Sequence, residues 1–303
     1  MLNPRTGLAA LASGCAHRSV SSAFARLGLF ARAGWHWQRR VPQRALACGA
    51  LGILSSCSNA RITQDFGAPP KNGATRIVSW NIMAARKTSL ADVTSRLLAL
   101  DPDIVLLQEV DQNVPRSGNV DEPRELGAAL SAQALFLPAI ELDGGRYGIA
   151  VLSTLQITMQ EPIQLTNVAA AEPRVALRAT VCVEAACFDV INHHADYVLV
   201  AARESSLEVL DAARPSIGKG IVVAGDFNQV PSDAGPRAYA EAGLLDIVAA
   251  SKFDGPTFKD RRIDFEFMDG RLMPCVLRSG VTVAPESDHN AVVVDVDPAP
   301  CLE

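Results

Sequence analysis

Several residues whose side chains bind ligands or transfer protons follow apolar, strand-like runs in this sequence. They are Asn81, Glu109, His194, Asp226 with Asn228, and the trio Ser287, Asp288 and His289. Sheets of α/β proteins gather ligand-binding groups at the ends of their strands. Taken singly these motifs indicate little, because an Asn after a strand is usually a turn residue and Gly-Asp-x-Asn is a common turn. Their joint occurrence indicates a site.

The segments that must position these residues alternate between apolar strands and helices. Residues 76–81 and 103–109 are predicted strands, and Ser89 can cap a helix between them that ends before Pro102. Further strands are predicted at 148–153, 174–182, 187–194, 220–226, 262–267 and 290–296, and helices at 197–213 and 232–242. This alternation is typical of an α/β layered domain. With no long linker, a single domain is expected from residue 73 to 298.

Charge is distributed unevenly along the chain. Residues 1–64 contain eight arginines, no lysine and no acid, which is the composition of a leader. Residues 65–303 contain 20 basic and 33 acidic side chains, a formal charge of −13. Strong sequence-independent binding to nucleic acid is therefore disfavoured, because it needs clustered Lys and Arg. The apolar content of 49% also excludes a disordered chain.

The leader contains the features of an export signal in residues 44–57. A basic flank and a short apolar stretch precede small residues, and the stretch is too short to span a bilayer. Leu54-Ser55-Ser56-Cys57 also resembles the lipobox of bacterial lipoproteins, in which the cysteine becomes lipidated. We therefore expect a leader at 1–57, a tether at 58–72 and an exported protein anchored to a membrane. An organellar transit peptide, a secretory leader or a true start at Val41 are the alternatives.

Seven cysteines are present, of which Cys15, Cys48 and Cys57 lie in the leader. Cys182 and Cys187 flank a possible short hairpin between two strand-like runs. They could form a disulfide or remain two buried thiols. The sequence contains no repeat, no Cys/His zinc spacing and no P-loop.

Six ordered motifs resemble the endonuclease/exonuclease/phosphatase superfamily, which includes the deoxyribonuclease-I-like fold. They are Trp80-Asn81-Ile82, Gln108-Glu109-Val110, Asn192-His193-His194, Gly225-Asp226-Phe227-Asn228, Arg262-Ile263-Asp264-Phe265 and Ser287-Asp288-His289. Tyr147-Gly148, Glu172-Pro173-Arg174 and Pro256-Thr257-Phe258 add to the resemblance. It implies a four-layer α/β/β/α sandwich of two packed mixed sheets with outer helices, and metal-dependent hydrolysis of a phosphate ester.

The resemblance also implies a metal site. Glu109 matches the principal metal-binding carboxylate, and Asn81 matches a residue that assists at the same metal site. Asp226 and Asn228 match the pair that orients the attacking water. Asp288 and His289 complete the expected metal side. Oxygen ligands of this type suit hard cations, so Mg²⁺ is expected, with Mn²⁺ or Ca²⁺ as substitutes and one or two ions bound.

Two histidines receive roles from the same resemblance. His289 matches the general base and Asp264 the carboxylate that orients it. His194 matches a histidine that donates a hydrogen bond to the phosphate or a proton to the leaving oxygen. Neighbouring strand residues face opposite sides, so one member of the His193–His194 pair is only a packing residue. Asn192 and Arg174 are expected to contact the substrate.

Three functions are compatible with these features. The first is an exported, lipid-anchored, monomeric phosphodiesterase or phosphatase that acts on a small-molecule or lipid head-group ester. The second is a secreted nuclease of the same mechanism, which the acidic charge disfavours. The third is an inactive binding protein on this fold. Ile149 and Thr154 stand where the family commonly has Asn and Arg, so two polar contacts to substrate are absent.

Overall fold

The computed structural model describes Phe66 and residues 74–166 and 171–303. The predicted leader, Cys57 and all of the predicted tether except Phe66 lie outside this part of the chain. Phe66 is buried, and the guanidinium groups of Arg76 and Arg278 lie over its ring. At least this residue of the 58–72 segment therefore packs against the domain.

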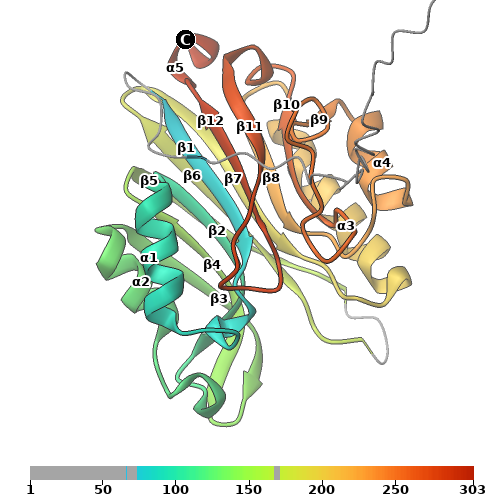
Figure 1. Ribbon diagram of the computed structural model, residues 1–303. Coiled ribbons are helices and arrows are strands. Elements are labelled where there is room, and N and C mark those ends of the chain that lie inside the picture. Colours follow the sequence, from blue (N-terminus) through green and yellow to red (C-terminus); the bar gives the residue numbers. More distant parts are fainter. Residues whose placement is uncertain (1–65, 67–73, 167–170) are drawn as a thin grey trace, which may run out of the picture. The chain divides into compact units, whose positions relative to one another are not determined.

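Two six-stranded mixed sheets form the centre of the described domain (Figure 1). The first has the order β11 (Val276–Thr282), β12 (Ala291–Val296), β1 (Thr75–Asn81), β2 (Ile104–Gln112), β4 (Gly145–Ser153) and β3 (Gln133–Leu142). The second has the order β5 (Gln156–Gln164), β6 (Val175–Val183), β7 (Ala186–His194), β8 (Ile221–Asp226), β10 (Asp264–Asp269) and β9 (Leu244–Asp246). In each sheet one central pair is parallel, β1 with β2 and β7 with β8.

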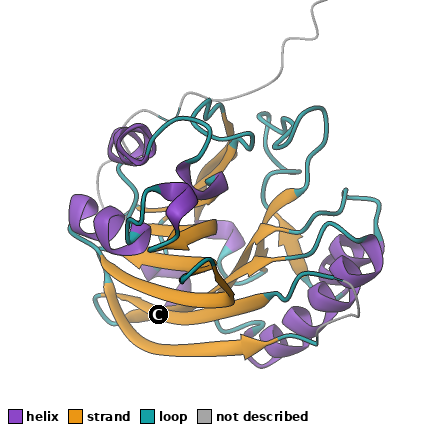
Figure 2. Ribbon diagram, turned by 90° about the horizontal axis from the view of Figure 1, so that it is seen from below, coloured by secondary structure: helices purple, strands orange, loops and turns teal. Residues whose placement is uncertain are grey.

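Four helices lie on the outer faces of the two sheets, as Figure 2 shows: α1 (Leu90–Leu100), α2 (Glu122–Leu130), α3 (Leu199–Ala213) and α4 (Ala234–Glu241). The short helix α5 (Ala299–Leu302) instead packs against the core between the sheets. Short 3-10 turns lie at η1 (Met83–Ala85), η2 (Pro115–Ser117), η3 (Arg214–Ser216) and η4 (Met273–Cys275). Side chains of α1 and α2 pack on the first sheet, and those of α3 and α4 on the second. The architecture is the predicted four-layer sandwich.

A continuous apolar core fills the space between the sheets. Ile77, Leu106 and Val151 of the first sheet meet Leu177 and Val190 of the second. Alternate residues of the same strands face the helices, so nearly every residue of the central strands is buried. This double burial explains the continuous apolar runs that the sequence shows at these strands.

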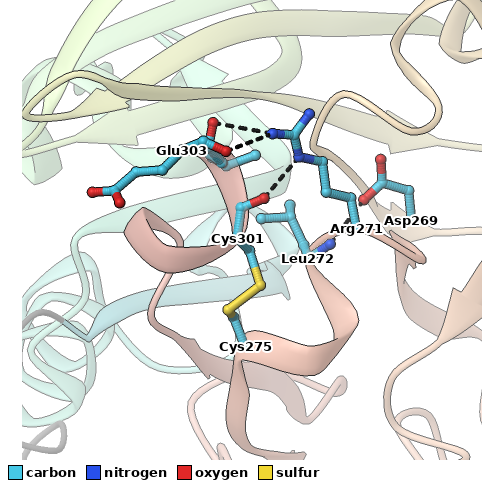
Figure 3. The surroundings of a disulfide bond; sticks show 7 residues. Asp269, Arg271, Leu272, Cys275, Cys301 and Glu303 are labelled. Atoms are coloured by element: carbon cyan, nitrogen blue, oxygen red, sulfur yellow. Dashed lines mark hydrogen bonds between the residues drawn. A yellow bond between two sulfur atoms is a disulfide. The ribbon is translucent and has the colours of Figure 1, made fainter.

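Two disulfides cross-link the described domain. Cys182 and Cys187 are direct neighbours across the β6–β7 hairpin and are joined, which is one of the two alternatives left open by the sequence. Cys275 and Cys301 are also joined, a pairing that the spacing did not suggest. Figure 3 shows that Arg271 donates to the carbonyl of Cys301 beside this second bond. The fold therefore extends through α5, beyond the expected boundary at residue 298.

Candidate active site

The strand ends bring the predicted residues to one edge of the sandwich. In the first sheet Asn81 pairs with Gln108, the residue before Glu109. In the second sheet Asp226 is the register partner of both His194 and Asp264. The loop after β11 is attached to the same edge, because Ser287 Oγ donates to the Asn81 carbonyl at 2.7 Å and Trp80 Nε1 donates to the His289 carbonyl at 3.0 Å.

Glu109 reaches the site through a β-bulge. The register between β2 and β4 shifts between Leu107 and Val110, and Glu109 has a left-handed φ of 55°. Leu106 and Gln108 face the opposite sheet, whereas Leu107 and Val110 face the helices. Glu109 is thus the extra residue of the bulge, a device that redirects a side chain at a cost in backbone strain.

Gly225 allows the Asp226 strand to approach β7. Its φ is 143°, and a Cβ at this position would lie 1.8 Å from the His193 carbonyl oxygen. Only glycine fits here. Asn228 then closes the turn with a φ of 49°, donating its backbone N–H to Asp226 Oδ1 at 2.9 Å and its amide to the Ala195 carbonyl at 2.9 Å.

The side chains converge on one oxygen, Oδ2 of Asp226. Asn81 Nδ2 lies 3.1 Å from it, and the Nε2 atoms of His194 and His289 lie at 3.7 and 3.8 Å. Asn81 Nδ2 also donates to Glu109 Oε1 at 3.2 Å, so one amide joins the two carboxylates. Burial, and secondly the nearby Asp264 carboxylate, raises the pKa of Asp226 to about 7.

His289 and Asp264 form a buried pair. His289 Nδ1 lies 2.9 and 3.2 Å from the two carboxylate oxygens, so it carries the proton, and in the neutral ring Nε2 is left as an acceptor facing Asp226. Burial alone lowers the pKa of His289, but the Asp264 charge and hydrogen bond, with Asp226 and Asp288, raise it to about 10. Thr257 Oγ1 fixes Asp264 by accepting the backbone N–H groups of Ile263 and Asp264 at 3.0 Å each.

His194 has the opposite tautomer. Arg174 Nη1 lies 3.0 Å from His194 Nδ1, and because arginine can only donate, Nδ1 is the acceptor. The ring proton is therefore on Nε2, which faces Asp226. Burial, and then the Arg174 charge, lowers the pKa of His194 well below its usual value. His193 is the packing member of the pair, since it is fully buried with its ring edge against Phe227.

Three residues that support the site received no role from the sequence, although Glu172 and Tyr147 stand in motifs of the family resemblance. Asp196 is buried and accepts the backbone N–H groups of Glu172 at 2.9 Å and Val198 at 2.7 Å, with Arg174 3.8 Å away. Glu172 pairs with Arg174 at 2.9 Å. Tyr147 hydrogen-bonds Arg174, and its burial raises the pKa of its hydroxyl. An acid two residues after His194 was a usable signal for Asp196.

One expected site residue lies elsewhere. Asn192 is fully buried between the sheets, accepts from Gln108 at 2.7 Å and donates to the carbonyls of Leu107 and Ala150 at 2.8 Å each. It links the sheets and contacts no open space, which corrects the expected substrate contact. Asp288 is exposed. The buried acid that accompanies Asp226 and His289 is Asp264, with ligand atoms of the three within 4.8 Å of one another.

The residues at this edge fit a divalent cation. The Glu109 and Asp226 carboxylates share one amide donor, and burial together with the Asp264 charge raises the pKa of Asp226, so its ionised form is destabilised. Carboxylate and amide oxygens are the ligands that Mg²⁺, Mn²⁺ and Ca²⁺ prefer. A cation held by the Glu109 and Asp226 carboxylates would neutralise these charges. Asn81 would join them as a ligand through its amide oxygen, with the amide turned from the orientation in which Oδ1 accepts the Met83 N–H.

Comparison with known proteins agrees with this arrangement. The sequence profile of the endonuclease/exonuclease/phosphatase family matches residues 78–289. The chain belongs to this family. Members generally hydrolyse phosphate esters and typically depend on a divalent metal. Comparison with curated protein sequences finds no match.

Solved structures share the fold at low sequence identity. An endonuclease/exonuclease/phosphatase from Beutenbergia cavernae is 24% identical, with 74% of this chain and 72% of that chain covered and a TM-score of 0.61. A mannosyl-6-phosphatase from Bacteroides thetaiotaomicron is 19% identical, with 73% and 98% covered and a TM-score of 0.56. TDP2 of D. rerio with a single-strand DNA product is 17% identical, with 74% and 99% covered and a TM-score of 0.56.

Proposed function

We propose that this protein is a divalent-metal-dependent phosphoesterase that hydrolyses a phosphodiester or phosphomonoester of a small molecule or lipid head group. The observation that carries the proposal is the convergence of His194 Nε2, His289 Nε2 and Asn81 Nδ2 on Asp226 Oδ2. In the proposed mechanism His194 Nε2 serves as a hydrogen-bond donor and the Nε2 of neutral His289 as a base, both beside the Glu109 and Asp226 carboxylates. That is the set of groups that in-line attack of water on a phosphate requires.

In this mechanism the two histidines have different tasks. In its neutral form His289 accepts the proton of the attacking water at Nε2, while Asp264 holds the ring and stabilises the charge that it gains. A cation bound beside Asp226 would favour this neutral form, because it opposes the positive charge of the protonated ring. His194 presents its Nε2–H to a phosphate oxygen, with Arg174 keeping Nδ1 unprotonated. Asp226 and Asn228 orient the water. A divalent cation, which Glu109, Asn81 and Asp226 would hold, would supply charge neutralisation at the phosphate.

A nuclease of the same mechanism is the second candidate. The Phe258 ring lies 4.7 Å from the His289 ring, and Lys259 and Arg261 lie over Phe258 at 4.8 and 5.6 Å. Such an aromatic group with two cations can contact a nucleic acid strand. The formal charge of −13 on residues 65–303 weighs against a polyanionic substrate.

The location of the protein is a separate proposal. We propose export and a lipid anchor at Cys57, on the basis of the leader and its lipobox-like end. The two disulfides support an oxidising compartment. None of the helices in the described residues is long and apolar enough to cross a bilayer.

A substrate panel tests the proposed function. The purified protein is assayed with Mg²⁺ or EDTA on bis(4-nitrophenyl) phosphate, 4-nitrophenyl phosphate, sphingomyelin and plasmid DNA. We expect turnover of a small or lipid ester that EDTA abolishes and Mg²⁺ restores. Preferential cleavage of plasmid DNA would favour the nuclease. Failure to hydrolyse any of these esters with Mg²⁺, Mn²⁺ or Ca²⁺ would refute the proposal.

A further inference from the structure

Four consecutive apolar residues, Tyr197 to Val200, are exposed where β7 passes into α3. Their exposed fractions are 78% for Tyr197, 39% for Val198, and 56% each for Leu199 and Val200. The other exposed large apolar residues of the described chain, none of them next to another in sequence, are Leu98, Met159, Leu245, Leu277 and Val283. Isolated exposed apolar residues are ordinary, whereas a contiguous exposed group indicates a binding surface. We refer to residues 197–200 as the apolar run.

The apolar run lies beside the candidate active site. Tyr197 is three residues after His194, and since consecutive Cα atoms are 3.8 Å apart, their Cα atoms are at most about 11 Å apart. The connection is fixed, because buried Asp196 accepts the Val198 N–H at 2.7 Å and the Glu172 N–H at 2.9 Å. The same Asp196 lies 3.8 Å from Arg174, which contacts His194. The run therefore keeps a constant position relative to the site.

A hollow of about 180 Å³ lies against the second half of the apolar run. Its lining residues are Leu199, Val200, Arg203, Gln229, Asp233 and Ala234. Gln229 directly follows Asn228, and Leu199 and Val200 follow His194 by five and six residues, so the hollow is lined by the segments that continue from both strands of the candidate site. Leu199, Val200 and Ala234 form its apolar part, whereas Arg203, Gln229 and Asp233 form its polar part. Its size suits a short stretch of alkyl chain.

The apolar run contributes little to folding. The residues of α3 that face the core begin at Ala201 and continue with Ala202, Ser205, Ser206 and Val209, and neither Leu199 nor Val200 belongs to them. Val198 occupies the N-cap of α3, where a polar side chain could accept a backbone N–H of the first turn and a valine cannot. Residues that break a local rule without a gain in stability are expected at functional sites.

We infer that the apolar run and its hollow bind an alkyl chain carried by the substrate, so that the substrate class is an amphiphilic phosphate ester. This inference rests on the proposed function, because it requires the ester to be cleaved beside His194 and Asp226. The chain lies along Leu199 and Val200 while the phosphate occupies the polar edge. Burying each methylene should raise kcat/KM by up to about fourfold.

Chain-length dependence tests this inference with the full-length protein. The substrates are 4-nitrophenyl phosphodiesters with a methyl, butyl or octyl second ester, and methyl, butyl or octyl monophosphates, all below their micelle concentrations. We expect kcat/KM to rise at least tenfold from methyl to octyl in the preferred series. The double variant Leu199→Ser/Val200→Ser should lose this rise and keep wild-type turnover of the methyl ester. Leu98→Ser, equally exposed on α1, is the matched control and should behave as wild type.

The outcomes separate the inference from the proposed function. If the wild-type protein cleaves neither series, the proposed function fails. If it cleaves the methyl ester without chain-length dependence, the alkyl subsite is refuted and the phosphoesterase stands. Equal losses on methyl and octyl esters in the double variant would also overturn the subsite. The wild-type protein could show no chain-length dependence but form a concentration-dependent dimer that the double variant does not form. That result would assign the apolar run to contact with a second copy of the chain.

Discussion

Glu122 is a buried acid that should make the stability of the fold depend on pH. It is the first residue of α2, and its side chain is 1% exposed. Oε2 accepts the backbone N–H of Asp111 at 2.8 Å, two residues beyond the Glu109 bulge, while Oε1 has no hydrogen-bond partner among the described residues. Burial, and the nearby Asp111 carboxylate, raises the pKa of Glu122 from 4.5 to about 8.

The two pKa values determine whether stability rises or falls with pH. The folded protein holds the Glu122 proton up to about pH 8, whereas the unfolded chain releases it near 4.5, so stability is full below 4.5 and is lost as the pH rises through about 8. At 1.36 kcal/mol per unit, this loss is about 4 kcal/mol between pH 5 and pH 9. Glu122→Gln keeps a carbonyl oxygen for the Asp111 N–H and cannot ionise. It should therefore be more stable than the wild-type protein at pH 9 by up to that amount.

Urea denaturation from pH 5 to pH 9 provides the measurement. The free energy of unfolding is compared for the wild-type protein, Glu122→Gln, and Glu125→Gln, an exposed acid on the same helix. The free energy of unfolding should fall with rising pH to the same extent in the wild-type and Glu125→Gln proteins. It should change less with pH in Glu122→Gln. Parallel curves for all three proteins would show that Glu122 is ionised in the folded state, and the argument from burial would be wrong.

Further predictions concern the histidines, a disulfide and the leader. His289→Ala should lower kcat more than about a hundredfold, and wild-type turnover would contradict its role as base. His194→Ala should lower the rate by the same factor for nitrophenolate and alkoxide leaving groups, because His194 donates a hydrogen bond to the phosphate. A loss limited to poor leaving groups would instead make His194 a general acid. Replacing both Cys275 and Cys301 by Ser opens a 26-residue loop and should reduce the free energy of unfolding by about 3.5 kcal/mol, and an unchanged urea midpoint would contradict this. Cys57→Ser should leave the protein unprocessed or release it from the membrane fraction, whereas unchanged fractionation would refute the lipid anchor.

The sequence predicted the inner strands of both sheets and missed the edges. The strands that were not predicted are β3, β5, β9 and β11, which are the four edge strands. Inner strands are covered on both faces and read as apolar runs, whereas β5 is largely exposed and polar. β3 also contains Pro138, which a central strand would not tolerate. An edge strand depends on its neighbour for its conformation, and its own pattern reveals little.

The sequence could predict which strand ends come together to form the site. Motif order selected Glu109, Asp226 and His289, which the structure brings to one edge. It could not give the bulge that turns Glu109 into the site or the direction of Asn192, because both depend on how the two sheets pack. The tautomer of His194 likewise follows from a cross-strand contact with Arg174.

The Mg²⁺ activation of a Glu109 variant tests the central proposal most directly. Hydrolysis of bis(4-nitrophenyl) phosphate, or of the ester preferred in the panel, is measured against Mg²⁺ concentration for the wild-type protein, Glu109→Ala, and Glu241→Ala, an exposed acid at the end of α4. The wild-type and Glu241→Ala proteins should show the same saturable activation. Glu109→Ala should keep the wild-type circular dichroism spectrum and lose the activation, because it removes a metal ligand and no core side chain. A folded Glu109→Ala protein with wild-type Mg²⁺-dependent turnover would contradict the assignment of this edge as the catalytic metal site.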